Sequence, residues 1–192
     1  MLGAALTAGA YALGSIPFGL LAARRAGADL RGEGSGNVGA TNVGRVLGKK
    51  TGRAVLALDA AKGAAPALVA RALLGPDDPW TAATGVAAVV GHCYPVWHRL
   101  RGGKGAATAA GVMLALVPPA GAVALVSYVA LKKASGRASV GSLGGALAGA
   151  AVSHALLGVS PRSAMTAAIL GVVVWRHRDN IGRLLRGTEP RS

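Results

Sequence analysis

The sequence predicts an all-α integral membrane protein, a single domain of residues 1–192 with about seven transmembrane helices. Three observations support this fold class. The chain is 52% hydrophobic and only 15% charged, with a mean hydropathy of +0.47, whereas about a quarter of the residues in soluble domains are charged. Its apolar segments consist mainly of Gly, Ala, Leu and Val, and small residues allow helices to pack closely in lipid. The net charge of +14 comes from basic residues clustered between apolar segments, as in the cytoplasmic loops of membrane proteins.

These features disfavour other interpretations. Nucleic-acid binding needs a basic face on a folded soluble domain together with a recognition motif, and the chain offers neither. Cys93 is the only cysteine, so no internal disulfide can form, and its apolar surroundings favour packing over nucleophilic chemistry. The N-terminus is apolar without a basic n-region, which predicts a first spanning helix instead of a cleaved signal peptide.

The first three spanning helices are expected at residues 2–23, 54–74 and 80–97. A loop at 24–53 carries seven basic residues against two acids, and basic residues return in "HRLRGGK" at 98–104. The turn between them, "GPDDP" at 75–79, has two acids and no base. The positive-inside rule therefore places loops 24–53 and 98–104 in the cytoplasm and the N-terminus outside.

The segment 106–131 is expected to form a hairpin of two short helices, 106–117 and 119–131. A single span would place Lys132 and Lys133 outside, against the charge rule, and Pro118-Pro119 breaks a helix. Each half is shorter than the roughly 20 residues of a full span. The hairpin therefore needs a thinned or protein-lined region of the bilayer.

The last two spanning helices are expected at 140–158 and 163–175, followed by a basic cytoplasmic tail. This gives seven helices with the N-terminus outside and the C-terminus cytoplasmic, and a count of five or six spans is the alternative. The final residues 187–192, "GTEPRS", are expected to be disordered.

Four polar segments then fall on the cytoplasmic side: "GSGNVGATNVGR" at 34–45, "GGKGAAT" at 102–108, "RASVGS" at 137–142 and "HRDN" at 177–180. Glycines let backbone N–H groups approach a ligand, and consecutive N–H groups form an anion cradle. Arg45 and Lys104 add positive charge, while His177 and Asn180 share a helix face. The convergence predicts one phosphate-binding site. The other candidates are small polar residues and glycines: Ser35, Gly36, Asn37, Thr41, Asn42, Gly102, Gly103, Thr108 and Ser142.

Each segment also has an interpretation without a ligand. Segment 34–45 can be a flexible loop, Lys104 a charge anchor at the membrane surface, and His177 an interfacial histidine. Ser142 can cap or pack a helix. What separates the two interpretations is whether these residues meet in space.

The sequence lacks the motifs for nucleotide hydrolysis, for a metal site and for hydrolysis by a pair of carboxylates. "GGKGAAT" has neither the full P-loop spacing nor a partner carboxylate, and no HExxH, Cys/His cluster or close carboxylate pair is present. We therefore expect no metal and no cofactor. His92 is expected to be a packing residue. Asp59 and Lys62 lie inside an apolar segment, where an isolated charge is costly, so they are expected to form an ion pair that is structural or supports the site.

The order of these motifs resembles a known family. "GSIPFGLL", "GSGNVGATNVGR", "DAAKG", "GHCYPVW", "GGKGAAT", "VGS" and "HRDNIGRLLRG" follow one another as in bacterial acyl-phosphate:glycerol-3-phosphate acyltransferases, the PlsY family. The first motif is very specific and the lysine loop fairly specific. Ala106, which replaces a usual valine, and the more basic "HRLRGGK" are mild departures.

The resemblance implies a multi-pass enzyme of the bacterial cytoplasmic (inner) membrane with its active site on the cytoplasmic side. It would transfer a fatty acyl group from acyl phosphate to the sn-1 hydroxyl of glycerol 3-phosphate, giving lysophosphatidic acid and phosphate. The implied partners are these substrates, membrane lipid and the enzyme that produces acyl phosphate, with no nucleic acid.

By match to the family motifs, Ser35, Arg45 and Lys104 would form the phosphate-binding core. His177 and Asn180 would orient the attacking hydroxyl or stabilise developing charge, and the proton would go to His177 or to the substrate phosphate. Because acyl phosphate has a good leaving group, direct attack without a covalent acyl-enzyme needs mainly positioning and charge stabilisation.

The main alternative is a membrane transporter of a phosphorylated solute. Its site would lie near the membrane midplane and open to both sides, whereas these polar groups collect at one interface. A phosphatidate phosphatase would need a nucleophilic histidine, a metal or a carboxylate pair. A structural membrane subunit would not need four polar motifs on one face.

Overall fold

The computed structural model describes all 192 residues, and the chain is built from helices without any β-strand. The longer helices are α1 (Leu2–Gly14), α4 (Lys49–Leu74), α5 (Pro79–Cys93), α6 (Ala106–Leu116), α7 (Pro118–Ser135), α8 (Ala138–Leu157) and α9 (Pro161–Arg176). The shorter ones are α2 (Phe18–Ala26), α3 (Ala40–Val46), α10 (Arg178–Leu185) and the 3₁₀ turn η1 (Val96–His98). The all-α class predicted from the sequence is confirmed.

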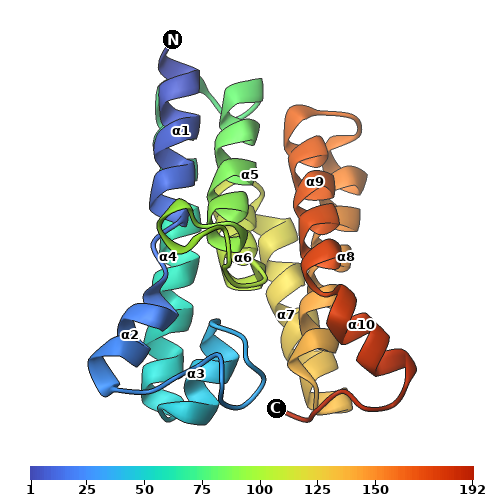
Figure 1. Cartoon of the computed structure of the whole chain (residues 1–192). Helices are drawn as coiled ribbons and strands as arrows, with labels where there is room; N and C mark the ends of the chain where they lie inside the picture. The colour runs from blue at the N-terminus through green and yellow to red at the C-terminus, as the bar shows by residue number, and fades with distance from the viewer.

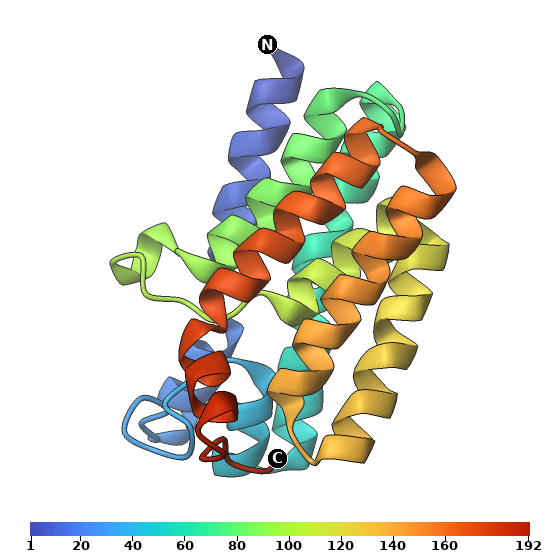
Figure 2. The same cartoon turned by 90° about the vertical axis from the view of Figure 1, so that its right-hand side faces the viewer.

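The longer helices form a bundle, and the short helices α2, α3 and α10 lie together at one end of it (Figures 1 and 2). The N-terminus lies at the opposite end, and the C-terminus lies near α3. The most extensive packing joins α7 with α8, α1 with α5, and α4 with α6. Fully buried side chains such as Val89, Val112, Leu116 and Ile169 tie α5, α6 and α9 into one core.

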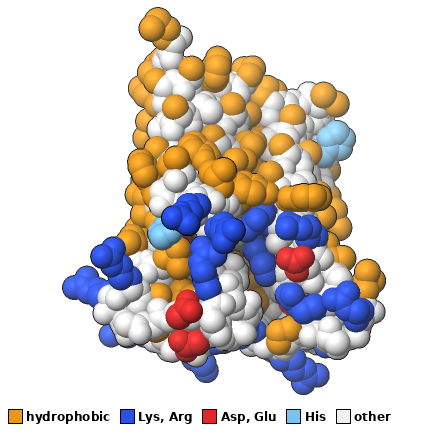
Figure 3. All heavy atoms as spheres, in the orientation of Figure 1, with side chains coloured by type: hydrophobic (Ala, Val, Ile, Leu, Met, Phe, Trp, Pro, Cys, Tyr) orange, Lys and Arg blue, Asp and Glu red, His pale blue; other side chains and the backbone are white.

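The surface separates into an apolar part and a basic part. Figure 3 shows hydrophobic side chains over the upper half and most Lys and Arg side chains over the lower half, around the short helices. Two helical stretches are long and apolar enough to cross a bilayer, Leu2–Ala26 and Ala138–Leu157, and Ala106–Leu116 is a shorter apolar helix. This distribution is typical of a membrane protein with one basic face.

The first apolar segment is not the continuous helix 2–23 that the sequence predicts. α1 ends at Gly14 and α2 begins at Phe18, because Pro17 cannot donate a backbone hydrogen bond and interrupts the helix. Lys62 donates from Nζ to the carbonyl of Ile16 at 2.7 Å. The break therefore leaves this carbonyl satisfied from α4, as an apolar environment requires.

The predicted hairpin is present as two separate helices. α6 ends at Leu116 and α7 begins at Pro118, so the chain turns at Val117 where the prolyl pair predicts a break. The second helix runs to Ser135, four residues beyond the predicted end at 131.

The last carbonyl groups of α6 have no partner within the helix, and two arginines donate hydrogen bonds to them. Arg71 of α4 donates to the carbonyl of Ala115 (2.9 Å), and Arg162 of α9 donates to the carbonyl of Leu116 (3.4 Å). Arg162 is itself held by two hydrogen bonds to the carboxylate of Asp77 (2.9 and 3.1 Å). The short helix thus ends against protein donors instead of lipid.

Candidate active site

A cavity of about 470 Å³ opens at the basic end of the bundle. Its walls come from α3, α4, α5, α6, α7, α8 and α10, from the loops before α3 and α6, and from the C-terminal tail. Eight residues singled out in the sequence line it: Ser35, Asn37, Thr41, Arg45, Lys104, Ser142, His177 and Asn180. The four polar segments therefore meet in space.

Five other candidates do not line this cavity. Thr108 is fully buried and packs against Gly63 of α4. Gly36 adopts φ +67°, a conformation that favours glycine. Gly102 and Gly103 pack against the end of α5, so packing alone excludes a side chain at either position. The fifth is Asn42.

Asn42 organises the loop before α3. Its side chain is fully buried, and Oδ1 accepts a hydrogen bond from the backbone N–H of Ser35 at 2.7 Å. Nδ2 donates to the carbonyls of Leu30 (3.1 Å) and Glu33 (3.0 Å). One amide thus satisfies three backbone groups and fixes Ser35 at the cavity wall.

Lys104 reaches into the cavity from the loop between α5 and α6. Its Nζ donates to Oδ1 of Asn180 at 2.5 Å. Burial lowers the pKa of Lys104 to about 8; the positive charge of Arg183 adds to this effect, and the negative charge of Glu189 opposes it. At neutral pH the side chain is mostly protonated and can bind an anion.

His177 lies between α9 and α10 and is buried, with only 3% of its surface exposed. Its Nδ1 lies 2.8 Å from the carbonyl oxygen of Val173. Because a carbonyl can only accept, Nδ1 carries the hydrogen and Nε2 is left as an acceptor. Burial lowers the pKa of His177 to about 4, although the bond to Val173 opposes this. The imidazole is therefore neutral at pH 7.

The C-terminal tail supplies a site residue that the sequence analysis did not identify. Glu189 is buried, and its Oε1 accepts hydrogen bonds from Ser139 (2.7 Å) and Asn180 (2.6 Å), while Oε2 accepts from Arg183 (2.7 Å). Burial alone would raise the pKa of this carboxyl, but these hydrogen bonds together lower it below its usual value. In the sequence, Glu189 stands out only as the one acidic residue of the final segment 187–192.

Instead of the disorder expected for 187–192, the tail crosses the mouth of the site. Arg45 of α3 donates from Nη2 to the carbonyl of Arg191 (2.7 Å). The Ser192 N–H donates to the carbonyl of Gly136 (2.8 Å), just before α8. These long-range hydrogen bonds connect the two sides of the cavity, and composition gives no sign of them.

The cavity continues into an apolar arm between α4, α6, α7 and α8. Leu56 of α4, Met113 of α6, and Leu125 and Val129 of α7 belong to its wall. Leu56 is 46% exposed and Val129 is 61% exposed, so the arm reaches the apolar outer surface. One cavity thus joins a cationic, hydrogen-bonding end to an apolar channel.

Comparisons with known proteins identify the family of the chain. A family model described as glycerol-3-phosphate acyltransferase matches residues 4–187. The chain is 49% identical over 183 residues to a glycerol-3-phosphate acyltransferase of Myxococcus xanthus, covering 94% of this chain and 95% of that one. It is 50% identical over 186 residues to one of Geobacter metallireducens, covering 97% and 95%.

Solved structures give the same answer. The crystal structure of PlsY, an integral membrane glycerol 3-phosphate acyltransferase, in its glycerol 3-phosphate form superposes with a TM-score of 0.97 at 40% identity, covering 100% of this chain and 96% of that one. The lysophosphatidic acid form superposes with a TM-score of 0.93 at 39% identity, covering 100% and 95%. The chain therefore belongs to the glycerol-3-phosphate acyltransferase family.

Proposed function

We propose that this protein transfers a fatty acyl group from acyl phosphate to the sn-1 hydroxyl of glycerol 3-phosphate, giving lysophosphatidic acid and phosphate. The observation that carries the proposal is the single cavity with a cationic end and an apolar arm. The cationic end suits the two phosphate groups, and the apolar arm suits a fatty acyl chain. Family membership supports the acceptor, and the chemistry of the site supports the donor.

The reaction is a direct attack. The sn-1 oxygen bonds to the acyl carbon, the bond from that carbon to the phosphate oxygen breaks, and phosphate leaves. Lys104 and Arg45 hold the phosphate groups and stabilise the negative charge that develops. No serine or cysteine needs to carry the acyl group, because both reactants are held in one cavity.

The proton of the hydroxyl goes to the departing phosphate. His177 has a pKa of about 4 and is a weak base, whereas the second pKa of a phosphate is about 6. Nε2 of His177 accepts a hydrogen bond from the hydroxyl and orients it, and Asn180 holds Lys104. His177 therefore acts through orientation more than through proton removal.

The remaining residues shape the phosphate cradle. Ser35, Asn37, Thr41 and Ser142 offer neutral donors at the cavity wall. The other members act through the backbone that they position: Gly36, Asn42, Gly102, Gly103 and Thr108.

In this proposal the chain lies in the bacterial cytoplasmic membrane with seven spans, counting α1 and α2 as one and then α4 to α9. The N-terminus is outside, and the C-terminus is cytoplasmic. The basic residues around α2, α3 and α10 (Figure 3) support a cytoplasmic position for the polar end. Glycerol 3-phosphate would enter from the cytoplasm, and acyl phosphate from the bilayer through the apolar arm. No cofactor takes part.

The test is turnover by the purified protein in proteoliposomes. With palmitoyl phosphate and labelled glycerol 3-phosphate we expect labelled lysophosphatidic acid and an equal amount of phosphate, and none with palmitoyl-CoA. Lys104→Ala and Arg45→Ala should abolish product formation, while Lys133→Ala, an exposed lysine at the end of α7, should not. Uptake of glycerol 3-phosphate into the vesicles without product would favour a transporter instead.

A further inference from the structure

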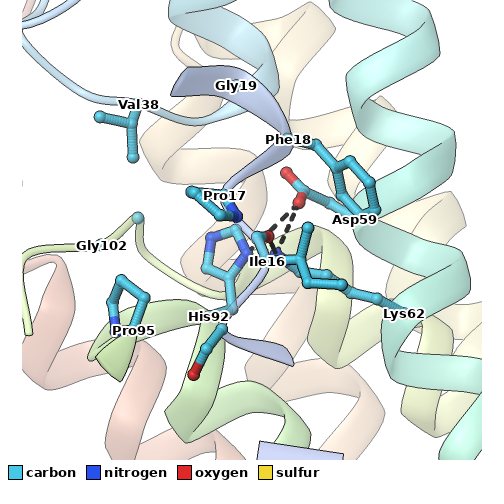
Figure 4. Close-up of a pocket in the computed structure, with 12 residues that line it drawn as sticks. Ile16, Pro17, Phe18, Gly19, Val38, Asp59, Lys62, His92, Pro95 and Gly102 are labelled. Carbon is cyan, nitrogen blue, oxygen red and sulfur yellow. Dashed lines mark hydrogen bonds and ion pairs between the residues drawn. The ribbon is translucent and has the colours of Figure 1, made fainter. Parts of the chain in front are cut away.

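His92 lies near the end of α5, next to the loop that carries Lys104. Figure 4 shows its imidazole converging with the carboxylate of Asp59 and the end of Lys62. Nδ1 of His92 lies 3.5 Å from Oδ1 of Asp59, and Nζ of Lys62 lies 2.9 Å from the same oxygen. All three side chains are buried around a cavity of about 10 Å³. Asp59 and His92 also belong to the wall of the large cavity, so the cluster adjoins the site.

The loop before Lys104 is folded directly onto this imidazole. The N–H of Gly103 donates to the backbone carbonyl of His92 (3.2 Å), and the N–H of Gly102 donates to the carbonyl of Cys93 (3.1 Å). A β-carbon on Gly103 would overlap Nε2 of His92, so the ring is the surface against which Gly103 rests. From the other side, Arg176 donates to the carbonyls of Gly102 and Gly103, both at 3.0 Å.

We propose that His92 is a positioning residue for Lys104. Its imidazole, facing Asp59, supports the backbone of Gly103 and so fixes where the Lys104 side chain enters the cavity. The ammonium group then meets Asn180 and the phosphate of glycerol 3-phosphate. This inference rests on the proposed function and adds to it a residue that does not touch the substrate.

The alternative is the packing role expected from the sequence. Packing alone requires volume, but it does not require a carboxylate opposite the ring. Asp59 is a poor probe of the difference, because its removal would leave Lys62 buried without its counter-ion and would destabilise the fold. Substitution of His92 leaves that ion pair in place.

The experiment compares His92→Ala with the wild type in the proteoliposome assay and in calorimetric titration with glycerol 3-phosphate. We expect the KM and Kd for glycerol 3-phosphate to rise about 10- to 100-fold, by analogy with residues that orient metal ligands. The value of kcat should fall as well, because Lys104 also stabilises the developing negative charge, while the thermal unfolding midpoint should change little. His98→Ala is the matched control, because His98 is an exposed histidine in the same segment, and it should behave as the wild type.

A second variant approaches the same contact from the loop. Gly103→Ala places a methyl group against the ring, so it should raise KM in the wild-type background. The increase in KM that Gly103→Ala causes should be smaller in the His92→Ala background, where the methyl group meets no ring. Such non-additivity is expected of groups that are in contact or that share a cavity or a backbone shift. If His92→Ala does not fold, His92→Gln takes its place, because glutamine keeps much of the volume but removes the ring against which Gly103 rests.

Unchanged KM and Kd in His92→Ala, additive effects in the double variant, or a loss of stability without a change in KM would each overturn the positioning role. Failure of the proposed function gives a different result, because the wild type itself would then form no lysophosphatidic acid.

Discussion

At the scale of single residues, the proposed site contains two ionisable groups whose pKa is lowered by burial. Lys104 stays cationic at pH 7 with a lowered pKa, and His177 stays neutral. The charged groups that act on Lys104 come from several elements: Arg176 on α9, Asp179 and Arg183 on α10, and Glu189 in the tail. Together with burial, these charges bring the pKa of Lys104 to about 8, so its loss of the proton can be followed in an activity assay.

We predict an alkaline limit to turnover from this titration. Lys104 loses its proton as the pH rises through about 8, and the neutral amine no longer attracts phosphate. The value of kcat/KM for glycerol 3-phosphate should therefore fall about tenfold per pH unit above that point. The Lys104→Arg variant should turn over more slowly, because the two side chains are not interchangeable. Its loss of activity should begin at a higher pH, since arginine does not lose its proton in this range.

The pH profile is measured between pH 6 and 10 in the proteoliposome assay. A profile that stays flat to pH 10, or an identical limb in Lys104→Arg, would contradict the role given to Lys104.

Among the residues predicted from the sequence, the charged ones and His177 line the cavity, whereas the glycines and two of the uncharged polar residues do not. Arg45, Lys104 and His177 could be placed at one interface because each follows an apolar segment on the basic side. Asn42 illustrates the limit. The same amide can face a ligand or satisfy backbone groups, and only the folded loop shows that it does the latter.

At the scale of helices, the α6–α7 hairpin shows how the chain tolerates helices shorter than a bilayer. The Pro118-Pro119 signal is local and therefore visible in the sequence. The arginines that satisfy the end of α6 come from α4 and α9, and pairing over such distances along the chain is not encoded locally. The short helices α3 and α10 contain no long apolar run, so the sequence indicates them only through side chains that would share a helix face, such as His177 and Asn180.

We predict that Arg162→Leu destabilises the fold without changing the site. The substitution removes a donor to the carbonyl of Leu116 and leaves it unsatisfied, which costs about 1–3 kcal/mol. The ion pair with Asp77 is partly exposed, so its loss should add little to the change in stability. The unfolding midpoint in detergent should fall by roughly 2–4 °C for each kcal/mol.

The KM for glycerol 3-phosphate should stay the same, because Arg162 lies at the end of the bundle away from the cavity. Arg25→Leu, at an exposed position of α2, serves as the control and should leave the midpoint unchanged. Equal midpoints for Arg162→Leu and the wild type would show that the end of α6 does not depend on this arginine.

At the scale of the whole molecule, the site exists only because distant parts of the chain are brought together. α3 and its preceding loop supply Ser35 and Arg45, α8 supplies Ser142, and the α9–α10 junction supplies His177. The tail connects these parts through Glu189 and the backbone carbonyl of Arg191. A short polar tail with Gly and Pro looks disordered in isolation, because its order comes entirely from partners elsewhere in the fold.

The central claim is that both reactants occupy this one cavity and that the acyl group moves between them in a single step. The most direct test mixes purified protein rapidly with palmitoyl phosphate alone and follows phosphate release. We predict no phosphate above the rate of spontaneous hydrolysis until glycerol 3-phosphate is added, and then one lysophosphatidic acid for each phosphate. A burst of phosphate equal to the amount of protein, without glycerol 3-phosphate, would reveal an acyl-enzyme and contradict direct transfer.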